Sequence, residues 1–154
     1  MVDIRQLYQE MIIDHGRKPR NFGELPEANR HAEGINPLCG DEITVHLKLS
    51  DDGVIEDVRF DGHGCAISTA SASLMSEALK GRTRDEAMRL FEGFHELVTG
   101  QQVEGAEKPD LGKLEVLGGV KAYPTRIKCA TLAWHTLSAA LKGENRVSTE
   151  ETGS

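Results

Sequence analysis

The stretch EITVHLKLSDDGVIEDVRF, residues 42–60, decides the fold of this chain. In its first half, apolar residues alternate with polar ones, which is the pattern of a strand with one buried face. The apolar positions are Ile43, Val45, Leu47 and Leu49. Residues 50–53, Ser-Asp-Asp-Gly, are typical of a turn, and residues 54–60 predict a second strand that runs back along the first.

Outward from this hairpin, the periodicity predicts helices over 3–15, 66–79, 83–98 and 124–141, and a weak strand near 28–35. Residues 83–86, Thr-Arg-Asp-Glu, form a capping box, and Pro124 suits the first turn of the last helix. We therefore expect an α+β fold in which a small antiparallel β-sheet of about three strands packs against helices. Residues 1–143 are expected to form a single domain, and 144–154 a flexible polar tail.

Composition excludes several classes of function. The chain has 154 residues, a formal charge of -7 and a pI near 5.4, so neither nucleic acid nor an anionic membrane is an expected partner. No apolar run approaches the roughly 20 residues of a membrane helix, and the N-terminus lacks the pattern of a signal peptide. We expect a cytoplasmic protein. In that reducing compartment, three cysteines indicate metal binding or thiol chemistry instead of a disulfide framework.

The hairpin is predicted to bring two of these cysteines close together. Its register, extended away from the turn, places Cys39 opposite Gly64 and Asp41 opposite Gly62. Cys39, Asp41 and Cys65 are therefore predicted to gather at the open end of the sheet. The glycines that flank them permit the close backbone approach that a tight ligand loop needs.

The third cysteine completes a candidate metal site. Cys65 opens the 66–79 helix, where unpaired backbone amides stabilise a thiolate, and Cys129 lies about one turn into the last helix. Cys39, Asp41, Cys65 and Cys129 would together supply the four ligands that zinc prefers. The spacing leaves open whether Cys129 is a ligand or a small buried apolar side chain. It also leaves His63 as an alternative to Asp41.

Three motifs in order resemble the IscU-like iron–sulfur assembly proteins: NPLCGD at 36–41, GCAIS at 64–68 and RIKCATLAW at 126–134. The resemblance covers residues 5–142 approximately, and it implies a fold like the N-terminal domain of NifU. Within the family, the chain resembles the SufU branch. Lys128 stands where the scaffold branch carries a histidine, and residues 100–119 resemble the insertion typical of SufU proteins.

The resemblance implies that Cys39, Asp41, Cys65 and Cys129 hold Zn²⁺. It further implies a sulfurtransferase-like activity, in which a SufS-type cysteine desulfurase hands persulfide sulfur to Cys39 for delivery to downstream Fe–S assembly proteins. Arg126, one turn before Cys129, is expected to steady a thiolate or persulfide by its charge, with an ordinary surface arginine as the competing interpretation. The main alternative is a scaffold that binds iron and assembles a [2Fe–2S] cluster. A structural zinc domain and a cysteine hydrolase are weaker alternatives.

Overall fold

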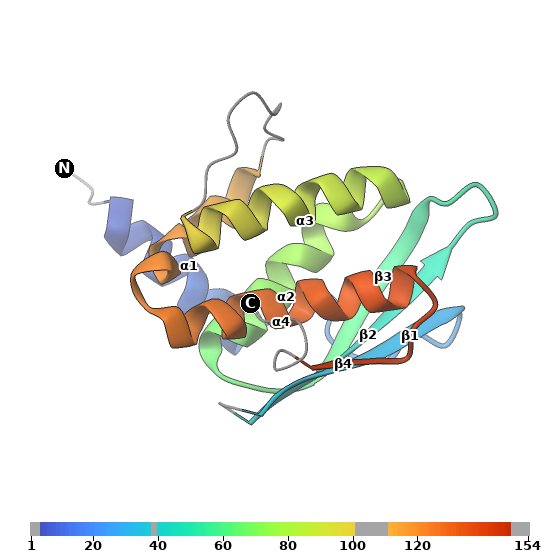
Figure 1. The fold of residues 1–154 in the computed structure, drawn as a ribbon, viewed down its shortest axis with the longest axis horizontal. Helices are drawn as coiled ribbons and strands as arrows, with labels where there is room; N and C mark the ends of the chain where they lie inside the picture. The colour runs from blue at the N-terminus through green and yellow to red at the C-terminus, as the bar shows by residue number, and fades with distance from the viewer. Residues whose placement is uncertain (1–3, 38–39, 101–110, 149–154) are drawn as a thin grey trace.

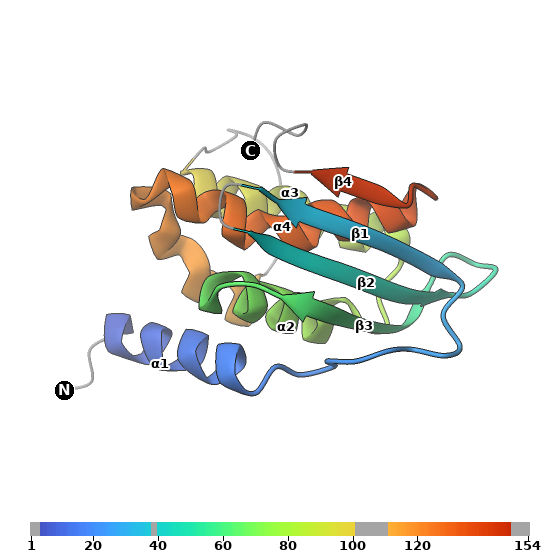
Figure 2. The same cartoon turned by 90° about the horizontal axis from the view of Figure 1, so that it is seen from below.

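A four-stranded sheet and a layer of helices over one of its faces make up the structure (Figures 1 and 2). The computed structural model describes residues 4–37, 40–100 and 111–148. In chain order the elements are α1 (Ile4–Arg17), β1 (Arg30–Asn36), β2 (Asp41–Leu49), β3 (Ile55–His63), α2 (Ala66–Leu79), α3 (Arg84–Thr99), the 3₁₀ helix η1 (Gly112–Ala122), α4 (Pro124–Leu141) and β4 (Arg146–Ser148). α2 and α4 lie against the sheet, and α3 packs outside them (Figure 1).

The predicted hairpin forms from β2 and β3, but its register differs from the prediction by two residues. Ile43 lies opposite Gly62, where the prediction placed Asp41. The backbone N–H of Ser50 donates to the carbonyl of Val54, so the second strand resumes only at Ile55, after an irregularity beside Leu49. This irregularity shifts every pair nearer the open end, and the candidate ligands remain together there.

The sheet has the order β3-β2-β1-β4, with β1 antiparallel to β2 and β4 parallel to β1. The α+β class is thus confirmed, and the sheet has one strand more than expected. β4 comes from the segment predicted to be a polar tail. β1 is a full strand despite Gly34 at its centre, and the structure gives the reason: a Cβ at Gly34 would collide with the side chain of Thr136 on α4.

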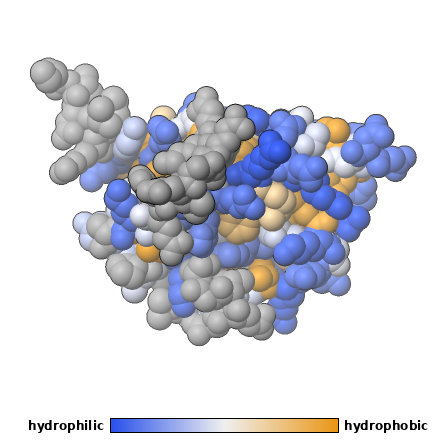
Figure 3. All heavy atoms as spheres, turned by 45° about the horizontal axis from the view of Figure 1, so that its top comes forward, coloured by the Kyte–Doolittle hydropathy of each residue, from blue (hydrophilic) through white to orange (hydrophobic). Residues whose placement is uncertain are grey.

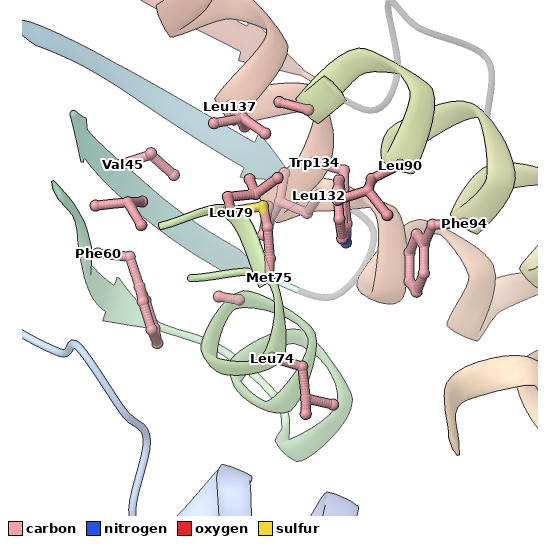
Figure 4. Close-up of a cluster of buried hydrophobic side chains, with 14 of the residues drawn as sticks. Val45, Phe60, Leu74, Met75, Leu79, Leu90, Phe94, Leu132, Trp134 and Leu137 are labelled. Atoms are coloured by element: carbon pink, nitrogen blue, oxygen red, sulfur yellow. The ribbon is translucent and has the colours of Figure 1, made fainter. Parts of the chain in front are cut away.

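The hydrophobic core fills the space between the sheet and the helices (Figure 4). Trp134 of α4 is fully buried and stacks on Phe94 of α3, with the ring centroids 4.9 Å apart. Val45 and Phe60 close the core from the sheet side. The buried side chains of α3 and α4 therefore agree with the apolar periodicity from which these two helices were predicted. Within the described ranges, no helix is both long enough and apolar enough to span a membrane.

Part of the connection between α3 and α4 is helical. The capping box starts α3 as predicted, because Glu86 N–H donates to Thr83 Oγ1 at 3.2 Å and Thr83 N–H to Glu86 Oε1 at 3.1 Å. Residues 101–110 lie outside the described residues. η1 follows them and buries Leu114, Leu117 and Val120. The outer face over α3 is mostly hydrophilic (Figure 3).

Hydrogen bonds fasten α1 and its following loop to α2. His15 is buried, and its Nδ1 lies 2.7 Å from Ser73 Oγ, which also accepts the backbone N–H of Arg20 at 2.8 Å. One residue after His15, a Cβ at Gly16 would lie only 3.3 Å from the carbonyl oxygen of Ala66. The end of α1 therefore sits against the start of α2, next to Cys65.

Candidate metal centre

Cys65 is the N-cap of α2. Its backbone is extended, with φ -70° and ψ 168°, and its Sγ accepts the backbone N–H of Ser68 at 3.4 Å. The first N–H groups of a helix have no partner within the helix, and they carry the positive end of its dipole. The sulfur of Cys65 is therefore placed where a thiolate is stabilised, and it is only half-buried.

Asp41 begins β2 and is 1% exposed. Its Oδ1 accepts the backbone N–H of Cys65 at 2.9 Å, which joins the start of β2 to the start of α2. Gly64 makes this approach feasible, since a Cβ there would lie 2.9 Å from Asp41 Oδ1 and 3.1 Å from Ser68 Oγ. The glycine before the cysteine is thus required by the buried carboxylate.

Cys129 of α4 completes the cluster. It is 0% exposed, and its Sγ lies 3.7 Å from the carbonyl oxygen of Thr125. A carboxylate oxygen of Asp41 and the sulfurs of Cys65 and Cys129 all lie within 4.8 Å of one another. Three ligand-type side chains from a strand and two helices therefore converge on one point. Cys39 lies outside the described residues.

Hydrogen bonds at this point favour a thiolate on Cys65. The pKa of the Cys65 thiol is lowered to about 6, chiefly by a hydrogen bond from Cys129 and also by the backbone N–H groups of Ser68 and Ile67. Burial and the Asp41 carboxylate act in the opposite direction.

Arg126 is the positive charge beside these sulfurs. It is exposed, and its pKa is raised, most by the negative charge of Cys65 and then by that of Cys129. Hydrogen bonds to both sulfurs add to this rise in the pKa. A guanidinium at the open side of the cluster can therefore attract and steady a sulfur anion.

The structure also places His63, the remaining candidate ligand, and two polar residues beside the cluster. His63, the alternative ligand, has a side chain 74% exposed that pairs with Glu42 at 3.5 Å, and it does not join the cluster. Sequence reasoning missed two buried polar neighbours, Asn36 and Ser68. The Asn36 amide donates toward Asp41, and Ser68 Oγ has no hydrogen-bond partner among the described residues. Asn36 precedes a proline and Ser68 lies within a helix, and neither has a sequence spacing that would have identified it as part of the site.

The donor set fits zinc. Zinc binds thiolate sulfur and carboxylate oxygen in tetrahedral sites, and iron–sulfur clusters are held mainly by thiolates. Asp41 and the two cysteines supply three such donors.

Comparison with known proteins identifies the family. The sequence profile described as NifU-like N terminal domain matches residues 7–130. The chain is 42% identical over 139 residues to the iron-sulfur cluster assembly scaffold protein IscU of Streptococcus pyogenes serotype M1, covering 90% of this chain and 85% of that protein. It is 41% identical over 138 residues to the zinc-dependent sulfurtransferase SufU of Bacillus subtilis strain 168, covering 90% and 91%.

A solved structure agrees with this comparison. The putative iron-sulfur cluster assembly scaffold protein for the SUF system of Fervidobacterium islandicum AW-1 superposes with a TM-score of 0.79 at 36% identity. The match covers 90% of this chain and 99% of that one. With a profile that spans most of the sequence and relatives above 40% identity, the chain belongs to the NifU-like N-terminal domain family.

Proposed function

We propose that this protein works in iron–sulfur cluster assembly as a zinc-bound acceptor of sulfur from a cysteine desulfurase of the SufS type. The observation that carries the proposal is the convergence of Asp41, Cys65 and Cys129 within 4.8 Å. Cys39, two residues before Asp41 in the sequence, would be the fourth ligand. The Bacillus relative named a zinc-dependent sulfurtransferase supports this choice of metal.

The residues around the site have complementary roles in this proposal. Bound zinc would keep the coordinating thiols deprotonated at neutral pH. Cys39 is the sulfur acceptor, because the proline and glycine near it in the sequence favour a loop that can release it. Arg126 keeps a positive charge beside the sulfurs, which attracts the incoming persulfide.

Transfer needs no added oxidant. The Cys39 thiolate attacks the outer sulfur of the persulfide on the desulfurase and forms a new S–S bond. The S–S bond of the desulfurase persulfide breaks, and its inner sulfur leaves with the electron pair as a thiolate. Any proton on the outer sulfur stays with it. The sulfur, now on Cys39, would then pass to downstream Fe–S assembly proteins.

The second candidate function is a scaffold for a [2Fe–2S] cluster. The Streptococcus relative is named an iron-sulfur cluster assembly scaffold protein, and three cysteines with an aspartate could ligate iron. Lys128 and the segment at 100–119 favour the sulfur acceptor, because both resemble the SufU branch. We further propose that the domain predicted for residues 1–143 also includes β4, which pairs with β1. The protein would work in the cytoplasm, where its cysteines stay reduced.

Anaerobic native mass spectrometry tests the proposal, before and after incubation with a SufS-type desulfurase and cysteine. We expect one zinc ion to stay bound and one sulfur atom to be added, located on Cys39 by peptide mapping. A Cys39→Ser variant serves as the control, and it should gain no sulfur. Iron and acid-labile sulfide that accumulate on the chain while zinc is lost would instead establish the scaffold function.

A further inference from the structure

We propose that Asn36 is the positioning residue of the metal site, and that its side chain sets the distance between Asp41 and Cys129. This inference rests on the proposed function, because it concerns the same ligands. It assigns a role to a residue that neither touches the metal in the proposed ligand set nor takes part in sulfur transfer.

Asn36 occupies a central position around the site. It ends β1, is 0% exposed, and pairs directly with Asp41 in the β1–β2 register. Its Nδ2 lies 3.3 Å from Asp41 Oδ2 and 3.7 Å from Cys129 Sγ. Its backbone carbonyl accepts the N–H of Gly40 at 2.9 Å. Asn36 therefore contacts Gly40, the Asp41 carboxylate and the buried Cys129 thiol.

The chemistry of an amide suits both ligands at once. An asparagine NH₂ group has two hydrogens, one for each of two acceptors. Hydrogen bonds to carboxylate or thiolate are stronger than those between neutral groups. Cys65 N–H already holds Asp41 Oδ1, so the Asn36 contact fixes the second oxygen of the same carboxylate. The carboxylate retains lone pairs for a metal, and its orientation is set on both sides.

Asn36 also closes a triangle of contacts between the elements that carry ligands. The Asp41–Cys65 hydrogen bond joins the hairpin to α2. Ser71 Oγ donates to the carbonyl of Ala130, which joins α2 to α4. The Asn36 amide supplies the remaining side, because it contacts both Asp41 of the hairpin and Cys129 of α4. Without it, Asp41 would be linked to Cys129 less directly, through Cys65 and through the packing of α4 on the sheet.

The test compares zinc affinity, measured by chelator competition with Zn²⁺, among the wild type, Asn36→Leu and Asn36→Ala. Leucine keeps most of the volume and removes the donor, so it remains informative if the alanine variant fails to fold. Loss of an outer contact to a metal ligand typically lowers affinity by about 10- to 100-fold, which we expect for both variants. The absorption spectrum of the Co²⁺ form should change as well, because it reports ligand geometry.

Asn29→Ala is the matched control. Asn29 also bonds across β1 and β2, through Leu49, but at the far end of these strands. Its loss should lower the unfolding temperature while zinc affinity and the Co²⁺ spectrum stay at wild-type values. Wild-type affinity and spectrum in Asn36→Leu would overturn this inference alone. A wild-type protein that binds neither metal would overturn the proposed function and this inference together.

Discussion

Replacing Gly64 by alanine should damage the metal centre through a single added methyl group. That Cβ would lie 2.9 Å from Asp41 Oδ1, closer than carbon and oxygen approach without a bond between them. Asp41 cannot simply turn away, because it is buried and its Oδ1 accepts the N–H of Cys65 at 2.9 Å. The other close atoms are Oγ and Cβ of Ser68, at 3.1 Å and 3.2 Å, so the methyl group is confined on two sides.

Overpacking of this kind costs about 1–3 kcal/mol, and the change from glycine to alanine returns roughly 0.4–1 kcal/mol by restricting the unfolded chain. We therefore expect the free energy of unfolding of the zinc-free Gly64→Ala protein to fall by about 1–2 kcal/mol. Zinc affinity should fall further, by about 10- to 100-fold, because the displaced atom belongs to a proposed ligand.

Urea unfolding of the zinc-free protein and chelator competition measure the two effects. Gly119→Ala is the control, since no atom lies within 4 Å of a Cβ at that glycine and its φ is not positive. It should leave both values close to wild type. If Gly64→Ala bound zinc as tightly as Gly119→Ala, Asp41 would not be held as a ligand, and the reasoning would fail.

Three further outcomes are expected. Burial, followed by the charges of His95 and Lys142, lowers the pKa of His135 from 6.5 to about 4. The folded state therefore favours the neutral imidazole, and the contribution of this preference to the free energy of unfolding is complete above pH 6.5 and is lost as the pH falls toward 4. Between pH 7 and pH 5 the zinc-free wild type should therefore lose about 2 kcal/mol more than His135→Leu in urea unfolding, and equal losses would contradict this. Arg126→Ala should slow sulfur transfer about tenfold in a single-turnover assay with the desulfurase, with Arg126→Lys in between, and an unchanged rate would leave Arg126 without a role. Gly34→Ala should lower the free energy of unfolding by about 1–3 kcal/mol, and the added change Thr136→Ala should restore part of it, because the two side chains compete for the same space.

The parts of the fold that depend on nearby residues were predictable. The alternation in β2, the capping box of α3 and the apolar faces of the helices each involve residues a few positions apart. The register was wrong by two residues because the contact between Ser50 and Val54 and the irregularity between Lys48 and Leu49 each shift it by one. β1 appeared weak because Gly34 interrupts it, and only the approach of α4 explains that glycine. β4 is three residues long and, in the described part of the chain, pairs with β1 alone, so it lacks a periodic pattern long enough to predict a strand.

In the candidate site too, contacts set by pairing along the chain were predictable, and contacts set by helix packing were not. Hairpin topology alone predicted that Asp41 and Cys65 would be neighbours, and the two are joined by a hydrogen bond. The approach of Cys129 depends on how α4 packs on β1, which no local pattern specifies. Asn36 was not identified as a site residue because its partner Cys129 lies 93 residues further along the chain, and their contact exists only in the folded structure.

The attachment of α1 has a consequence for how the molecule opens. The only fully buried side chain described on this helix is the polar His15, and the apolar side chains that support it are only partly buried. Polar contacts are replaced by water more easily than apolar packing, so α1 should separate at a lower free energy than α4. Separation would also free Gly16 from Ala66, beside Cys65. Amide hydrogen exchange in α1 and at the start of α2 should therefore rise together, as one cooperative unit, and binding of metal should slow both.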